Sequence, residues 1–200
     1  DFLNMRLSHA VNSMTCLLIT SKGKIPVNVI IDSGSNTSNI DESLIKELGL
    51  KPSTEEFDRT VRYVSTTATY PTAGYDLQFV SPDNHHTQSV TAFRVQNFNS
   101  VIPNWYEVCK THKYLEDLPI IKPKNNVAKI LLGTDCPSLF QNLENISSQN
   151  EGPTATRNIL GWSFLGKFTP NNLAPNVSKT FKQEVENLVP KKEKTVRLKS

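Results

Sequence analysis

The stretch that most constrains the fold of this chain is residues 27–50. An apolar run of mostly β-branched residues ends at Asp32, and a small Ser-Gly-Ser segment follows it at residues 33–35. The run predicts a buried strand, and the small residues predict a tight loop directly after that strand. A rigid strand would therefore present the Asp32 carboxylate at the start of a loop.

The rest of the chain shows patterns that are typical of strands. Residues 13–20 and 25–31 flank a glycine-containing turn and predict a β-hairpin whose second strand delivers Asp32. We also expect strands at residues 75–80, 87–95 and 127–132, and a last strand pair within 158–168.

One short helix is predicted after the Asp32 loop. Asp41 is a favourable N-cap, and Gly49 is a favourable C-terminal stop. Leu44, Ile45 and Leu48 give the segment between them an apolar stripe. The fold class predicted from these patterns is all-β with one or two short helices.

The domain organisation follows from composition. We expect an N-terminal arm, or a first edge strand, at 1–12 and one folded domain at 13–169. A linker with a basic tail is expected at 170–200, with a marginal helix near 179–188. Residues 97–126 are irregular and rich in proline, with a short helix expected near 106–115. Asp1 in place of methionine suggests a fragment of something longer.

Charge and cysteine content exclude several function classes. The 22 basic and 19 acidic residues give a net charge of +3, so a nucleic-acid partner is not expected for this domain. No apolar run approaches the roughly 20 residues that cross a bilayer, so we expect no membrane association. Three scattered cysteines fit a reducing compartment. Cys109 and His112 have a metal-like spacing but lack a second pair, so no metal site is expected.

A second segment at 127–135 resembles the first. An apolar strand runs into Gly133 and Asp135, about a hundred residues after Asp32. Asp135 is expected to cap the turn or helix that follows.

Three blocks in this order resemble the retropepsin-like aspartic protease of BEL/Pao-type retrotransposons. They are IIDSGS at 30–35, ILLGTD at 130–135 and LGWSFLG at 160–166. The resemblance implies a retropepsin-like acid protease fold with a closed, barrel-like β core, and a hydrolase that cleaves the polyprotein of its own element. It also implies an intracellular, cytoplasmic site of action in the retroelement particle.

The resemblance assigns roles to particular residues. Asp32 would be the catalytic acid, and Ser33 would hydrogen-bond across a two-fold axis. Loop support would come from Ser33, Gly34, Ser35, Gly133 and Asp135. The chemistry needs no cofactor, but it needs two carboxylates that share a proton, and this chain carries one Asp-Ser-Gly triplet. A second copy of the chain is therefore the expected partner.

Residues 59–75 are rich in Thr, Val and Tyr and predict two strands around a mobile tip at about 65–74. Such a tip is a candidate flap that closes over the peptide substrate. The residues expected to contact substrate are Thr66, Thr67, Ala68 and Thr69. An ordinary polar hairpin is the alternative.

Two departures from the related viral enzymes keep a second function open. Asn36 and Thr134 stand where those enzymes carry an ion-paired Asp and Arg, and the flap lacks a glycine-rich tip. The alternative is a catalytically dormant module that binds or assembles with partners. A third alternative, nucleic-acid binding through the basic tail, has less support.

Overall fold

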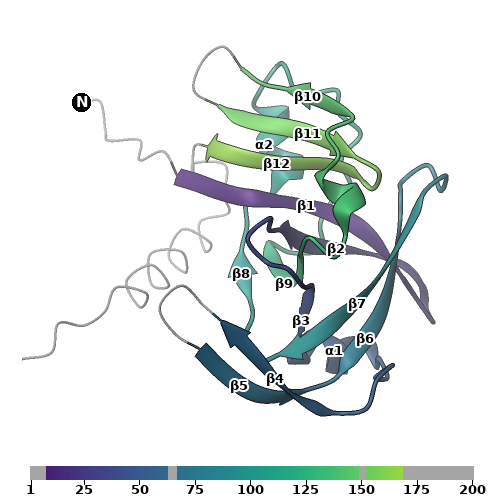
Figure 1. Cartoon of the computed structure of the whole chain (residues 1–200). Coiled ribbons are helices and arrows are strands. Elements are labelled where there is room, and N and C mark those ends of the chain that lie inside the picture. Colours follow the sequence, from purple (N-terminus) through teal and green to yellow (C-terminus); the bar gives the residue numbers. More distant parts are fainter. Residues whose placement is uncertain (1–7, 63–66, 149–151, 169–200) are drawn as a thin grey trace, which may run out of the picture.

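The computed structural model describes residues 8–62, 67–148 and 152–168 (Figure 1). The strands are β1 (Ser8–Thr20), β2 (Gly23–Ile31), β3 (Asn39–Asp41), β4 (Phe57–Arg62), β5 (Thr67–Thr72), β6 (Gly74–Val80), β7 (Thr87–Val95), β8 (Ser100–Val101), β9 (Val127–Leu132), β10 (Glu144–Ile146), β11 (Pro153–Asn158) and β12 (Gly161–Phe168). The helical segments are α1 (Glu42–Leu48), α2 (Trp105–Lys110) and the 3₁₀ turn η1 (Pro137–Phe140). The prediction of a mostly β chain with short helices is confirmed.

Six strands close into a barrel, in the order β1, β2, β9, β3, β7, β6 and back to β1. The closing contact pairs Leu17 with Val80 and Leu18 with Phe79, between β1 and β6. The expected barrel-like core of a retropepsin-like fold is therefore present. Its interior is a single apolar cluster that includes the fully buried Val29 and Ile130.

Two parallel pairings decide where the Asp32 loop lies. β2 runs parallel to β9, with Ile31 paired with Leu132, and β3 runs parallel to β7. Because β2 and β9 point the same way, the loops after Ile31 and after Leu132 leave the barrel at the same end. The two acidic segments of the sequence are thus brought side by side.

β1 is longer than predicted, and its two halves pair with different strands of one ten-stranded sheet (Figure 1). Its second half, from Ser13 to Thr20, pairs with β2 as expected. Its first half pairs with β12, which continues through β11 to β10. Of the two expectations for residues 1–12, an arm or a first strand, the strand applies to residues 8–12. Residues 1–7 lie outside the described residues.

The last part of the domain also differs from the prediction. Residues 158–168 were expected to hold a strand pair, but they contain only the turn and β12. The partner strand is β11, which begins at Pro153. Proline is tolerated there because it is the first residue of the strand. The predicted linker, tail and marginal helix at 170–200 lie outside the described residues.

The proline-rich segment at 97–126 packs against β11 and β12, at one end of the ten-stranded sheet. α2 begins at Trp105, one residue before the predicted start, and ends at Lys110 rather than near 115. The Trp105 ring stacks on Phe164 of β12, with ring centroids 5.1 Å apart. Trp105 Nε1 donates to Ser13 Oγ at 2.9 Å, so its one polar atom is satisfied within this second core.

α1 has the predicted boundaries. Asp41 Oδ1 accepts a hydrogen bond from Ser43 N at 2.9 Å, as an N-cap side chain does. Gly49 adopts a left-handed conformation with φ of 63°, which glycine reaches without a steric cost. Leu44 and Ile45 are buried in the barrel core. Neither helix in the described part of the chain has the length and apolar character to cross a bilayer.

β4 and β5 form a separate two-stranded antiparallel sheet that lies beside the barrel (Figure 1). This is the hairpin expected for a flap. Its turn is displaced from the prediction, because Arg62 pairs with Thr67 and residues 67–72 are a strand. Residues 63–66, which include Thr66, lie outside the described residues.

Candidate active site

Asp32 is the first residue after β2, and its own loop fixes the carboxylate. Asp32 N donates to Leu132 O of β9 at 3.0 Å, and Ser35 N donates to Asp32 O at 3.2 Å. Gly34 N donates to carboxylate atom Oδ1 at 2.9 Å. The other carboxylate atom, Oδ2, has no hydrogen bond to any described residue. The Asp32 side chain is partly exposed, so Oδ2 is open to a ligand or a partner.

Ser33 and Gly34 are exposed at the tip of this loop. A Cβ at position 34 would lie 3.2 Å from Asp32 Oδ1, so any side chain there would crowd the carboxylate. Ser35 is partly buried, and its Oγ donates to Thr37 O at 2.8 Å. The role expected of Ser33 requires a second copy of the chain, so it stays a prediction.

The segment after β9 supports the loop from the side. Thr134 N donates to Ser35 O at 2.8 Å. Gly133 N donates to Ser38 Oγ at 3.1 Å. Asp135 accepts from Ser38 N at 2.8 Å and from Ser38 Oγ at 2.7 Å. Four hydrogen bonds therefore join two segments that are about a hundred residues apart.

Asp135 does not have the capping role predicted for it. The N-cap of η1 is Cys136, and no side chain caps that turn. Both carboxylate oxygens of Asp135 accept hydrogen bonds from Ser38 instead, so the carboxylate is engaged with the loop. Ser38 is fully buried and is the centre of this network, and sequence analysis missed it. It is one of several small polar residues between 33 and 39, with nothing in the pattern to distinguish it.

Gly133 allows the two segments to approach closely. A Cβ at this position would lie 2.6 Å from Ser35 O and 2.8 Å from Thr37 O. Both are backbone atoms, so no rotation of a side chain could make room. Residue 133 must therefore be glycine for the loop to keep this position.

A sequence model of the aspartyl protease family matches residues 18–135, which is more than half of the chain. The chain belongs to the aspartyl protease family. The match begins within β1 and ends at Asp135, so it includes Asp32 and the whole network just described. No curated protein and no solved structure matches this chain.

Two neutral residues, one in the Asp32 loop and one after β9, stand at the positions of the ion pair that the related viral enzymes carry. Asn36 and Thr134 occupy the two positions, and both are exposed. Thr134 Oγ1 donates to Ser35 O at 3.3 Å, beside the hydrogen bond of its own backbone N–H. Hydrogen bonds to the backbone of Ser35 thus hold the loop, and the ion pair is absent at these positions, as the sequence indicated.

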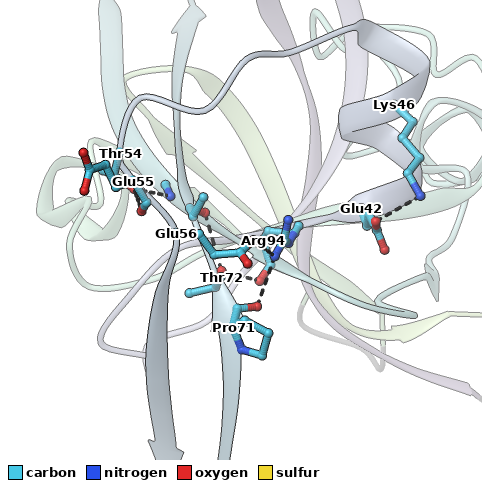
Figure 2. Close-up of polar contacts among 10 residues, drawn as sticks. Glu42, Lys46, Thr54, Glu55, Glu56, Pro71, Thr72 and Arg94 are labelled. Carbon is cyan, nitrogen blue, oxygen red and sulfur yellow. Dashed lines mark hydrogen bonds and ion pairs between the residues drawn. The ribbon is translucent and has the colours of Figure 1, made fainter.

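Arg94 of β7 fixes the base of the flap hairpin (Figure 2). Its Nη2 donates to Glu56 Oε2 at 2.6 Å and to Pro71 O at 3.2 Å. Thr72 Oγ1 donates back to Arg94 O at 2.8 Å. The hydrogen bond to Glu56 raises the pKa of the Arg94 guanidinium above its usual value. The two ends of the hairpin are therefore anchored to the barrel.

Three of the predicted flap residues are placed by the structure. Thr67, Ala68 and Thr69 lie in β5 and are exposed. Thr69 Oγ1 hydrogen-bonds with Thr60 Oγ1 at 2.8 Å, across the strand pair. The described residues show no hydrogen bond between these three and the Asp32 loop, so their contact with substrate stays a prediction.

Arg59 of β4 makes the contact that sequence analysis missed. Its Nη1 donates to Asn39 Oδ1 at 2.8 Å, and its Nη2 donates to Thr37 Oγ1. The guanidinium carbon lies 4.6 Å from the centroid of the Phe93 ring. Arg59 therefore joins the flap hairpin to the end of the Asp32 loop, at Thr37 and Asn39. Its two hydrogen-bond partners lie 20 and 22 residues earlier in the sequence, so no local pattern could have revealed the contact.

The cysteines are buried thiols. Burial raises the pKa of Cys109 to about 12, and burial with the nearby Asp135 charge raises the pKa of Cys136 to about 11, although a hydrogen bond from Ser38 opposes the shift. His112 Nδ1 lies 3.0 Å from Val108 O rather than facing Cys109. In the part of the chain that the structure describes, no three His, Cys, Asp or Glu side chains cluster as metal ligands do.

Proposed function

We propose that this chain is an active aspartic endopeptidase that works as a homodimer on the polyprotein of a BEL/Pao-type retrotransposon. The observation that supports it most is the Asp32 loop itself. A carboxylate with one oxygen fixed by Gly34 N and the other open stands at the exposed end of a rigid strand. Membership of the aspartyl protease family supports the same chemistry.

Peptide hydrolysis by aspartic proteases uses two carboxylates that share one proton. The ionised carboxylate takes a proton from water as the water oxygen attacks the peptide carbonyl carbon, and the protonated carboxylic acid donates to the carbonyl oxygen. The C–N bond then breaks as the amide nitrogen receives a proton. The two carboxylates titrate as one unit, and neither step requires a metal or a cofactor.

The need for a second copy follows from the carboxylates that this chain supplies. The 200 residues contain one Asp-Ser-Gly triplet. Asp135 is the nearest alternative in the sequence pattern, but both of its oxygens are hydrogen-bonded to Ser38. A partner chain related by a two-fold axis would place a second Asp32 opposite the first, and exposed Ser33 and Gly34 would then face their counterparts.

The proposal of a retrotransposon origin rests on the three blocks of sequence described above. The third block, at 160–166, forms the end of the turn between β11 and β12 and most of β12. It lies beyond the region that the family model matches. A polyprotein substrate and action inside an intracellular retroelement particle follow from that resemblance.

The experiment is an Asp32→Asn variant assayed on a polyprotein or on a peptide library. Asparagine is nearly isosteric, so the fold should persist by circular dichroism while cleavage is lost. Asp117→Asn, an exposed carboxylate far along the chain from the loop, is the matched control and should cleave as the wild type does. Cleavage that persists in Asp32→Asn would remove Asp32 from the mechanism. A wild-type chain that cleaves no substrate would favour the dormant binding module.

Co-expression with the inactive variant tests the homodimer. If two copies form one site, about a tenfold excess of Asp32→Asn chains should lower activity per wild-type chain about tenfold, because most wild-type chains then pair with an inactive partner. A monomeric enzyme would keep its activity per wild-type chain. Sedimentation of the purified chain gives the same answer independently.

A further inference from the structure

Arg59 lies on the face of β4 that is turned toward the Asp32 loop. Exposure alternates along this strand, with Arg59 and Val61 partly buried and their neighbours exposed. Phe57 shares this face and meets Phe93 edge-on, with ring centroids 5.8 Å apart. The guanidinium therefore lies between the flap hairpin and the loop, in the region where a substrate would be enclosed.

The described residues provide no opposite charge to neutralise Arg59. Both of its hydrogen-bond partners, Asn39 and Thr37, are neutral. Among the residues that the structure describes, no carboxylate lies within ion-pair distance of it. The neighbouring Arg94, in contrast, pairs with Glu56 at 2.6 Å.

Arg59 also keeps donors for a ligand. A guanidinium has five N–H groups in a fixed fork, and the two hydrogen bonds to the loop use only two of them. The stacking on Phe93 and these two bonds hold the side chain in place, so little further conformational entropy is lost when a carboxylate binds. An arginine prepared in this way is suited to an acidic group.

Strand pairing places Asn39, the residue that Arg59 binds, near Asp32. Asn39 pairs with Leu131 on one side of β9, and Ile30 pairs with Leu131 on the other side. Two strand spacings, or about 10 Å, therefore separate the backbones of Asn39 and Ile30, and Asp32 lies about 7 Å further along β2. The backbones of Asn39 and Asp32 are thus about 12 Å apart, a distance that about four residues of an extended peptide span.

We propose that Arg59 forms a subsite for an acidic side chain of the substrate, within about four residues of the scissile bond. The substrates would then be peptide segments that carry Asp or Glu near the cleavage point. This inference rests on the proposed function, because it takes Asp32 as the position of the scissile bond.

The test is the cleavage profile of a proteome-derived peptide library, read by mass spectrometry. The wild-type chain should enrich Asp and Glu at one position near the cleaved bond, with about a tenfold preference in kcat/KM for Glu over Gln in matched peptides. In Arg59→Gln the ratio of kcat/KM for matched Glu and Gln peptides should fall to about one, whatever the overall rate of the variant, and Arg59→Lys should keep the preference in part. Arg59→Glu should turn it into a preference for Lys or Arg.

Arg62→Gln is the matched control. Arg62 lies on the same strand but on the exposed face, so its removal should leave the profile unchanged. A wild-type profile without acidic enrichment, or an enrichment that survives in Arg59→Gln, would overturn the subsite. Loss of the acidic enrichment in Arg62→Gln would also overturn the subsite. The preference would then come from the net positive charge of the hairpin and not from a contact with Arg59.

A binding assay separates failure of the subsite from failure of the proposed function. The Asp32→Asn chain is applied to an immobilised array of the same Glu and Gln peptides, with and without Arg59→Gln. Preferential retention on Glu peptides that depends on Arg59 supports the subsite, even if the wild-type chain cleaves nothing and the proposed function fails. Equal retention on both peptide sets overturns it.

Discussion

Replacing Gly133 with alanine tests whether the position of the Asp32 loop depends on the close contact between its backbone and the backbone at Gly133. The new Cβ would lie 2.6 Å from Ser35 O and 2.8 Å from Thr37 O, distances that real Cβ atoms do not tolerate. Either the loop or the end of β9 must move. Movement would weaken the hydrogen bonds from Thr134 N to Ser35 O and from Gly133 N to Ser38 Oγ.

The size of the effect can be worked from these contacts. Overpacking costs about 1–3 kcal/mol, and the contact with rigid backbone places this case near the upper end. We therefore expect the free energy of unfolding to fall by about 3 kcal/mol. For a domain of this size that corresponds to a melting temperature lower by about 6–12 °C.

Urea unfolding followed by circular dichroism measures the loss, and Asp32-dependent peptide cleavage measures its effect on the site. Gly152→Ala is the matched control, because its Cβ would meet only Tyr114 Oη, at 2.6 Å, which lies at the end of a side chain. That variant should lose about 1 kcal/mol, through the hydrogen bond from Tyr114 to Pro153 O, and should keep full activity. If Gly133→Ala unfolds within about 0.5 kcal/mol of the wild type and cleaves equally well, the close contact does not position the loop.

Two further measurements address the network and the thiols. Asp135→Asn and Ser38→Ala should each lower the free energy of unfolding by about 1.5–3 kcal/mol, and the double variant should lose less than the sum, because both remove the same hydrogen bonds. Additive losses in urea unfolding of the four chains would refute the shared network. Burial raises the pKa of Cys109 to about 12 and that of Cys136 to about 11, from 9.0, so the unfolded thiols ionise first and stability falls as pH rises above 9. Cys136→Ala should make this decline shallower between about pH 9 and pH 11, and an unchanged slope in unfolding experiments would contradict the burial effect.

Local patterns were sufficient for the elements that bury one face or carry a cap. The apolar run before Asp32 predicted β2 because it reads as a continuous buried strand. Asp41 and Gly49 predicted both ends of α1 because capping is decided by single residues. The acidic loop itself could be located for the same reason, since it follows directly from the end of β2.

Features that depend on distant pairing could not be predicted. Residues 8–12 form a strand because β12 pairs with them, and the irregular register there removes the alternation that would mark a strand. Asp135 turns toward Ser38 rather than η1 because β2 and β9 run in parallel, which no local pattern shows. Arg59 looked like one charge on a polar hairpin, and only the position of β4 beside the loop gives it a role.

The parallel pairing of β2 with β9 has a consequence for the timing of synthesis. A ribosome that has just made Asp32 must add about a hundred more residues before β9 exists, which takes about 5–20 s at usual rates of translation. Until then, the Asp32 loop has only its own internal hydrogen bonds and lacks those from the segment after β9. In a newly made chain, Asp32 would therefore be present for some seconds before the segment after β9 can support its loop. The complete site could form only when the domain is almost fully synthesised.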